Sequence, residues 1–222
     1  MTKIRNDLFN PRNGLDRGRS KWVEASWYLL KCFIFLSPLP FPSSLKRVLL
    51  RCFGARIGRG VVIKPRVNIH FPWKLSVGNH SWIGEETFIL NFEPATIGAH
   101  CCISQRVFLC GGNHDYRQAD MAYRNGPITI HDGVWVGAQS FVAPDVTIGR
   151  EAVIIAGSVV TRSLPEEMVC TGNPCRPAKH RWQTAPEAEA EPNAGEPAAL
   201  PWIFNSNNGW ELNPKPLEHE LV

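Results

Sequence analysis

An aliphatic residue recurs at every sixth position through the middle of this chain. The period holds within five successive triplets, which are separated by 8, 8, 21 and 6 residues. The recurring positions are 57, 63, 69, 77, 83, 89, 97, 103, 109, 130, 136, 142, 148, 154 and 160. A period of six belongs neither to a helix nor to a single long strand. It is typical of a parallel β-helix, in which each hexapeptide forms one flat side and three sides complete a coil.

The triplets predict a prism of five coils over residues 54–182. With strands about 4.8 Å apart, the prism would be roughly 24 Å tall. The breaks in the period insert 2, 2, 15 and no residues, and all of them follow a third side. The insertions must therefore emerge along one edge of the prism.

The longest insertion is the arm loop, residues 110–128, with the sequence CGGNHDYRQADMAYRNGPI. It leaves the common edge near mid-height and carries His114 close to its start. A loop of this length within a tight solenoid is usually functional, so we expect part of the active or binding site here.

Residues 1–53 predict a polar, Arg-rich arm followed by two helices, near 22–37 and 43–54. The first helix is apolar on most sides but contains Glu24 and Lys31. A membrane span needs roughly 18 or more apolar residues without such charges, so we do not expect this helix to cross a membrane.

Two interpretations of these helices stay open. In one, they cover an end of the β-helix core. In the other, their apolar residues enter a membrane interface while Lys46, Arg47 and Arg51 meet lipid phosphates.

Residues 183–222 are rich in Pro, Ala, Glu and Asn, and hold one Lys and seven Glu. Such a segment cannot bury enough apolar surface to offset the entropy of ordering, so a disordered acidic tail is predicted. Four apolar residues in it could form a short partner-binding patch: Trp202, Ile203, Phe204 and Trp210.

The formal net charge is +4, and because the tail carries −6, residues 1–182 carry +10. A basic body suits an anionic ligand, nucleic acid or an anionic membrane, and charge alone does not choose among them. The seven cysteines include no CxxC pair, and the N-terminus has no secretory signal. Both features favour a reducing, cytoplasmic compartment.

Several motifs together resemble the hexapeptide-repeat acyltransferases. They are the hexapeptide array, GNHD in the arm loop, DGVWVGAQSFVAPDVTIG after it, and TGNPCRPAK at the exit. FNPRNGLDRGRS, followed by an apolar helix, is similar more narrowly to the colanic acid biosynthesis acetyltransferase group. The resemblance covers residues 8–182.

The resemblance implies a left-handed parallel β-helix assembled as a homotrimer, with acetyl-CoA in the cleft between neighbouring prisms and the arm loop reaching across. The implied reaction moves acetyl from acetyl-CoA to a sugar hydroxyl in exopolysaccharide biosynthesis. A nucleotide sugar or a free saccharide stays open as the acceptor. We expect no nucleic-acid partner, and a location in the cytoplasm or peripherally at the inner face of the cell membrane.

A sugar hydroxyl is a poor nucleophile at neutral pH, so the transfer needs a base beside it and donors for the developing oxyanion. Histidine has a suitable pKa in general, and His114 is the candidate base. Asp115, and Asn91 below the loop, are candidate acceptor contacts. Arg117 and Arg124 are assigned to trimer contact or acceptor binding, without a choice between them.

The other side of the cleft is expected to hold the cofactor. Glycine and alanine permit close backbone approach, so amides there could bind the pantetheine arm or the oxyanion, while cations suit the phosphates of CoA. The predicted cofactor residues are Trp135, Gly137, Ala138, Gly157, Ser158, Thr161, Asn173, Pro174, Arg176 and Lys179.

Three rival interpretations were weighed. Cys110 could be acylated in a covalent route. His80 and His100 should stack on one outer face and could suggest a zinc site like that of trimeric carbonic anhydrases, but Ala119 stands where that pattern has a second loop histidine, so no metal is expected. A β-helix without catalytic activity, serving as a scaffold, is the third.

Overall fold

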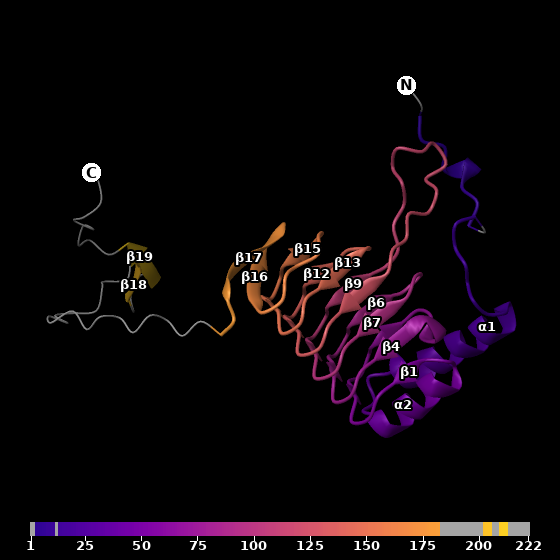
Figure 1. Ribbon diagram of the computed structural model, residues 1–222, viewed down its shortest axis with the longest axis horizontal. Coiled ribbons are helices and arrows are strands. Elements are labelled where there is room, and N and C mark those ends of the chain that lie inside the picture. The colour runs from indigo at the N-terminus through magenta and orange to yellow at the C-terminus, as the bar shows by residue number, and fades with distance from the viewer. Residues whose placement is uncertain (1–2, 12, 183–201, 206–208, 213–222) are drawn as a thin grey trace, which may run out of the picture. The chain divides into compact units, whose positions relative to one another are not determined.

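The computed structural model describes residues 3–11 and 13–182, and the strand backbones at 202–205 and 209–212. Within residues 13–182 the chain winds into a parallel β-helix (Figure 1). The coil strands of the first face are β1 (Arg56–Ile57), β4 (Leu75–Val77), β7 (Ala95–Ile97), β10 (Ile128–Ile130) and β13 (Val146–Ile148). Those of the second are β2 (Val62–Ile63), β5 (Trp82–Ile83), β8 (Cys102–Ile103), β11 (Trp135–Val136) and β14 (Val153–Ile154). Those of the third are β3 (Asn68–Ile69), β6 (Phe88–Leu90), β9 (Phe108–Cys110), β12 (Phe141–Val142) and β15 (Val159–Val160).

The register of these strands stacks the predicted core positions directly over one another. On the first face Ile57 pairs with Val77 and Val77 with Ile97, and the other two faces repeat the pattern. All fifteen recurring aliphatic residues are buried. Because successive strand residues point to opposite sides, each short strand buries its aliphatic residue and turns its neighbour outward. The prediction of five coils is confirmed.

Backbone hydrogen bonds join each coil to the next in both directions. Gly58 donates to Val77 at 2.8 Å, and His80 of the second coil donates to Arg59 of the first at 2.8 Å. The first coil is therefore left with carbonyls that need donors and with N–H groups that need acceptors, such as that of Ile63, which donates to Ser43 Oγ at 3.0 Å. The last coil is left with the same two kinds of group.

Two helices cover the first coil (Figure 1). They are α1 (Lys21–Leu30), which continues as a π-helical turn, η2 (Lys31–Phe35), and α2 (Ser43–Cys52). Trp27, Phe35 and Leu50 join the main hydrophobic core. The interpretation that the helices close one end of the core is confirmed. Among the described residues, no helix has the length and apolar character needed to cross a membrane. Short 3-10 helices lie at η1 (Asn6–Leu8) and η3 (Pro72–Lys74).

Cationic side chains of α2 supply the donors that the first coil needs. The Lys46 ammonium donates to the carbonyls of Ile63 at 3.3 Å and Lys64 at 2.9 Å, and Arg47 donates to Val61 at 2.8 Å. Arg51 donates to Ile57 at 2.9 and 2.6 Å. These bonds engage the three cations that the second interpretation directs to lipid phosphates.

A hairpin closes the other end of the β-helix. β16 (Met168–Gly172) pairs in parallel with β14, and β17 (Cys175–His180) folds back antiparallel to β16. Ile155 of the last coil donates its N–H to Cys170 at 2.9 Å, and Gly149 donates to Leu164 at 3.0 Å. Backbone carbonyls of the C-terminal segment thus accept hydrogen bonds from N–H groups of the last coil.

Most of the predicted disordered tail lies outside the described residues. Within it the structure has two short strands, β18 (Trp202–Asn205) and β19 (Gly209–Leu212), paired antiparallel. The sequence analysis assigned no strand here. Two apolar runs flanking an Asn-rich turn are, however, a hairpin pattern. The side chains of the predicted partner-binding patch lie outside what the structure describes.

Replacing Lys46 by Met should lower the free energy of unfolding by about 1–3 kcal/mol, because the carbonyl of Lys64 loses its donor and that of Ile63 keeps only the Ser43 hydroxyl. Urea unfolding measures the change. Lys64→Met, which removes an exposed ammonium from the same coil, is the matched control and should have little effect. Unchanged or increased stability of the Lys46 variant would mean that burial of the ammonium costs more than its hydrogen bonds contribute.

Candidate active site

The arm loop folds back on itself as a narrow projecting hairpin (Figure 1). His114 and Tyr123 form an antiparallel bridge, and Asp115 donates its N–H to Ala122 at 2.8 Å. The N-terminal segment, residues 3–11 and 13–20, runs beside this hairpin. Arg5 donates its N–H to the carbonyl of Ala119 at 2.7 Å. Residues of the N-terminal segment and of the arm loop, which are far apart in the sequence, therefore both shape the surroundings of His114.

The orientation of His114 is set by a backbone carbonyl of its own loop. His114 Nδ1 lies 2.5 Å from the carbonyl oxygen of Met121. Because a carbonyl oxygen only accepts, Nδ1 donates, and Nε2 keeps the lone pair that a general base needs. Met121 has a φ of +51°, an uncommon value for a residue with a side chain. In this backbone conformation the Met121 carbonyl points toward the imidazole.

Two aromatic rings, which also contact each other, pack against the imidazole. Tyr123 stacks on His114 with ring centroids 5.0 Å apart, and Phe9 of the N-terminal segment meets it edge-on at 5.2 Å. Phe9 and Tyr123 also contact each other at 5.1 Å. The sequence analysis missed both residues. Phe9 lies in the FNPRN motif used for the resemblance, but nothing in the motif indicates what the ring contacts.

The carboxylate of Asp115 does not orient His114. Its carboxylate pairs with Arg117 at 3.0 Å and accepts a hydrogen bond from Gln118 at 3.3 Å. The Arg117 guanidinium is the main reason that the pKa of Asp115 falls to about 2. Acceptor binding by Asp115 would have to compete with this pair. Arg124 is exposed, and its backbone N–H donates to Asn113 at 2.8 Å.

Asn91 lies at the predicted edge but its side chain is already occupied. Its Nδ2 donates to the carbonyl of Phe71 at 2.6 Å, and its Oδ1 accepts from the N–H of Phe71 at 2.9 Å. Only 1% of Asn91 is exposed. Direct acceptor contact, as expected for Asn91, would have to displace these bonds: the carboxamide replaces a ladder pair at the turn that follows β3, and it positions Phe71.

Most of the predicted cofactor residues lie on a different edge from His114. Ala138 and Gly157 occupy stacked turns between the second and third faces, and Asn173 lies in the turn between β16 and β17 of the second face. The arm loop leaves the edge between the third and first faces. Thr161 follows β15 and lies on the same edge as the arm loop. One chain thus presents the base and most of the cofactor residues on opposite sides of its third face.

The hydrogen bonds separate available cofactor groups from occupied ones. Gly137 donates its N–H to Ile154 at 2.8 Å, and Gly157 donates to Ala138 at 2.8 Å. The buried hydroxyl of Ser158 donates to Ile155 at 2.6 Å. Among the described residues no acceptor is found for the Ala138 N–H, so this amide is available to a ligand.

Side chains above and below this turn remain open to solvent. Trp135 is half exposed on β11, and its indole N–H donates to Ser104 at 2.9 Å. Asn173 and Pro174 form the turn between β16 and β17, and Arg176 and Lys179 lie exposed on β17. These two cations can meet anionic groups without losing an internal ion pair, since no ion pair within residues 13–182 involves them.

Cys110 has the environment of a packing residue. It is 9% exposed, its thiol donates to Gly112 at 3.2 Å, and burial raises its pKa. Because the thiolate is the reactive form, these surroundings disfavour acylation. His80 and His100 stack at 5.4 Å, as predicted. The described residues contain no group of three or more His, Cys, Asp or Glu side chains that could hold a metal ion.

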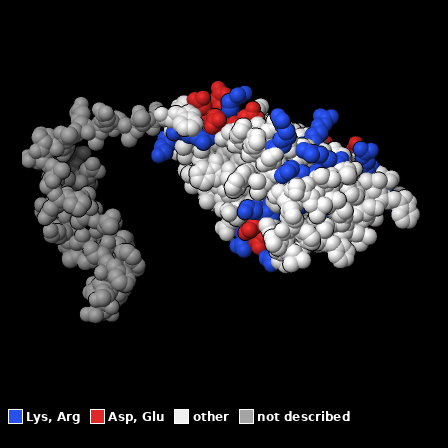
Figure 2. Space-filling model, turned by 90° about the horizontal axis from the view of Figure 1, so that it is seen from below, with Lys and Arg blue, Asp and Glu red and all other residues white. Residues whose placement is uncertain are grey.

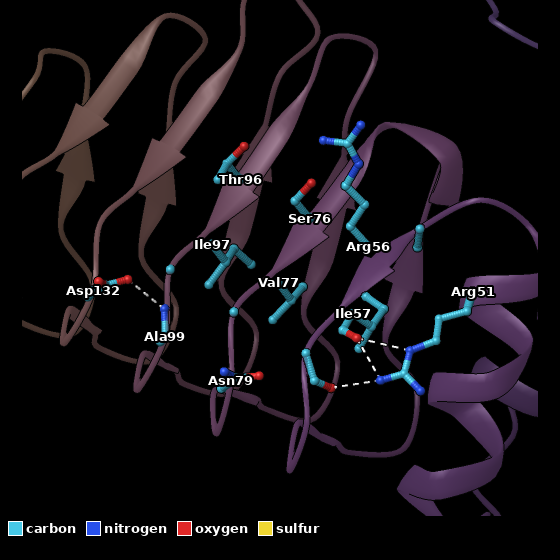
Figure 3. Close-up of a pocket in the computed structure, with 14 residues that line it drawn as sticks. Arg51, Arg56, Ile57, Ser76, Val77, Asn79, Thr96, Ile97, Ala99 and Asp132 are labelled. Carbon is cyan, nitrogen blue, oxygen red and sulfur yellow. Dashed lines mark hydrogen bonds between the residues drawn. The ribbon is translucent and has the colours of Figure 1, made fainter.

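A hollow of about 660 Å³ lies on the first face, near the end of α2 (Figure 3). The Arg51 guanidinium at its margin donates to the carbonyls of Ile57 and Gly58, and Asp132 accepts from the N–H of Ala99 at 2.7 Å. Ser76 and Thr96 project from the strands beside it. Its ionic groups are largely engaged with backbone, so we place the candidate site at the arm loop instead.

Comparison with known proteins agrees with this architecture. Residues 127–162 match the family model described as bacterial transferase hexapeptide (six repeats). WcaF of Escherichia coli (strain K12), named for colanic acid biosynthesis acetyltransferase activity, is 40% identical over 158 residues, which cover 71% of this chain and 87% of WcaF. Galactoside O-acetyltransferase of the same strain is 32% identical over 126 residues, which cover 55% of this chain and 62% of that enzyme.

A solved structure shares the fold. It is a hexapeptide-repeat-containing acetyltransferase of Vibrio cholerae O1 biovar eltor, complexed with acetyl coenzyme A. The TM-score is 0.67 at 26% sequence identity, and the match covers 73% of this chain and 89% of the other.

Proposed function

This chain belongs to the hexapeptide-repeat acyltransferase family, and from that premise we propose that it moves acetyl from acetyl-CoA to a saccharide hydroxyl in exopolysaccharide biosynthesis. It is an acetyl-CoA-dependent acyltransferase. The similarity to WcaF supports an exopolysaccharide building block as the acceptor. The observation that carries the proposal is the orientation of His114, whose Nδ1 is tied to the Met121 carbonyl and whose Nε2 is left as a base.

The reaction needs one proton acceptor and no covalent intermediate on the protein. As the sugar oxygen attacks the thioester carbonyl, His114 Nε2 takes the hydroxyl proton. The new C–O bond forms, the C–S bond breaks, and the imidazolium returns the proton to the departing CoA thiolate. The unoccupied N–H of Ala138 supports a role in stabilising the oxyanion that develops between these steps.

The site is completed by a neighbouring subunit in this proposal. His114 and the Ala138 turn lie on different edges of one prism, so neither chain alone brings base and cofactor together. A homotrimer would place the arm loop of one subunit against the second-to-third edge of the next. Sedimentation velocity counts the subunits directly, and a monomer that retains full activity would contradict this arrangement.

The cofactor side of that cleft is formed by Trp135, Ala138 and the β16–β17 hairpin. Arg176 and Lys179 are the exposed cations of the hairpin, and they suit the phosphates of CoA. Gly137 and Gly157 allow the cofactor to approach the backbone closely, but their N–H groups are already bonded.

A membrane surface is the proposed location, at the cytoplasmic side. All seven cysteines are free, which supports a reducing compartment. Large apolar side chains are exposed on the helical end, including Trp22 at 84% and Phe33 at 73%. Figure 2 shows a broad uncharged surface with Lys and Arg gathered at its margin. Such a surface suits an interface contact of the kind that amphipathic helices make.

His114→Ala should reduce acetyl transfer by about 10²- to 10⁴-fold. CoA release measures the rate, with the acceptor first chosen by mass spectrometry from lipid-linked and nucleotide sugars. His131→Ala, which removes an exposed histidine outside the loop, should leave the rate unchanged. Full activity in the His114 variant would show that another group is the base. Stable acetylation of the protein without acceptor, seen by intact mass, would replace direct transfer with a covalent route.

Replacing Arg176 and Lys179 by Ala together should raise KM for acetyl-CoA by about tenfold or more, because charge-assisted bonds to phosphate are lost. The same variant should handle acetyl-pantetheine, which has no nucleotide phosphates, as well as the unmodified protein does. An equal KM for acetyl-CoA in both proteins would remove these cations from the cofactor site.

Replacing Trp22 and Phe33 by Ser should weaken co-sedimentation with vesicles containing anionic phosphatidylglycerol, since the apolar side chains would no longer enter the interface. Activity on a water-soluble acceptor should not change. Trp182→Ser is the control, because this exposed tryptophan lies outside the helical end. Vesicle binding that is the same in all three proteins, or absent from the unmodified one, would contradict the membrane location.

A further inference from the structure

A cavity of about 720 Å³ lies between α1 and the turn that follows β3. Aromatic side chains form much of its wall, among them Tyr28, Phe71 and Trp73. Phe71 and Trp73 stack with ring centroids 5.0 Å apart. A cavity of this size, mainly apolar with a few polar groups, has the usual character of a small-molecule site. The proposed mechanism does not use it.

The cavity contains an ammonium group without a counter-ion. Lys31 lines it, and only 6% of the residue is exposed. Within the described part of the chain, the Lys31 ammonium makes neither a hydrogen bond nor an ion pair, and it lies 5.4 Å from the centroid of the Tyr28 ring. Lys46, which is 0% exposed, bonds to two carbonyls. A charged group largely enclosed by protein is normally paired, so the Lys31 ammonium is available to an anion that enters the cavity.

The remaining charges of the cavity favour an anion. Arg17 and Lys21 add two further cations, and Glu24 is the single carboxylate of the lining, held by Arg17 at 2.7 Å. Burial, together with the charges of Lys31 and Arg17, lowers the pKa of His70 to about 4. His70 is therefore neutral near pH 7. The lining carries three positive charges against one negative charge.

A continuous run of rings connects this cavity to the proposed base. His70 contacts Phe92 at 4.9 Å, Phe92 contacts Tyr123 at 5.8 Å, and Tyr123 stacks on His114. The N-terminal segment follows the same route, with Pro11 at the cavity and Phe9 at the imidazole. A molecule that carries an anionic group at one end and a hydroxyl at the other could occupy both places.

We propose that this cavity binds the phosphate of a phosphorylated saccharide acceptor, with Lys31 as the counter-ion. The idea rests on the proposed acetyl transfer to a sugar and deepens it. Nucleotide-linked and lipid-linked sugars share the required glycosyl diphosphate chemistry. The aromatic wall contacts the parts of the acceptor next to the phosphate.

The first test uses the full chain and inorganic pyrophosphate, read by thermal unfolding and calorimetry. Pyrophosphate should raise the Tm of the unmodified protein and of His114→Ala alike. Lys31→Met should weaken its binding by about 10- to 100-fold, as expected for loss of a charge-assisted bond. Lys64→Met is the control and should bind normally. Equal binding by Lys31→Met, or no binding by the unmodified protein, would overturn the proposal.

A second readout needs no ligand. Because Lys31 is partly desolvated and has no partner, which lowers the pKa of its ammonium, Lys31→Met should unfold at the same or a higher Tm than the unmodified protein when phosphate is absent. A lower Tm would mean that Lys31 stabilises the fold and is not kept for a ligand. Lys31→Arg, which restores a cation, should recover part of the pyrophosphate binding, and no recovery would count against the ion pair.

The source of the phosphate is resolved by two acceptors, UDP-glucose and glucose linked to a short polyprenyl diphosphate in detergent. KM should rise in Lys31→Met for whichever compound is acetylated, with a smaller change in kcat. If pyrophosphate binds through Lys31 but His114→Ala remains fully active, the cavity stands and the base assignment fails. If His114→Ala is inactive but no phosphate binds, the acetyl transfer stands and the cavity assignment fails.

Discussion

Each coil of a β-helix satisfies its backbone through its neighbours, so the whole structure depends on what meets the first and the last coil. Here the bonds between coils run in both directions, so each end is left with carbonyls and N–H groups that need partners. At the first coil, Lys and Arg side chains of α2, which carry donors only, bond to the carbonyls. At the last coil, Ile155 donates its N–H to Cys170, and Glu167 donates its N–H to Arg150. Placing α2 at the first coil also places α1, and with it the cavity that contains Lys31.

The sequence was sufficient for the repeating part of the molecule. A six-residue period with one inward position per side leaves a single register that buries every aliphatic residue, and pairs such as Ile63 with Ile83 follow from it. Counting the breaks also located the arm loop on its edge. Both inferences depend only on the spacing of residues in the repeat, because residues one coil apart in the sequence are neighbours in the structure.

The sequence was insufficient wherever a side chain is held by a residue from another part of the chain. Asn91 was placed on the correct edge, but its two bonds to Phe71 reach back a full coil. His114 was located, yet the group that orients it is a backbone carbonyl, which has no sequence signature. Phe9 contacts the imidazole from the opposite end of the domain. The cations of α2 have the composition of a lipid-binding face, and only their hydrogen bonds show that they cap an edge.

The bond between Arg5 and Ala119 has a consequence for the order of synthesis. Arg5 leaves the ribosome more than one hundred residues before its partner, and coils can stack as they emerge because each contacts only the preceding one. The part of the N-terminal segment around Arg5 must therefore wait for the arm loop, whereas Arg17 can already meet Trp73 between the first and second coils. The bond from Arg5 to Ala119 closes a long-range contact of the kind that forms slowly. The walls around His114 are thus assembled late, after most of the scaffold that carries them.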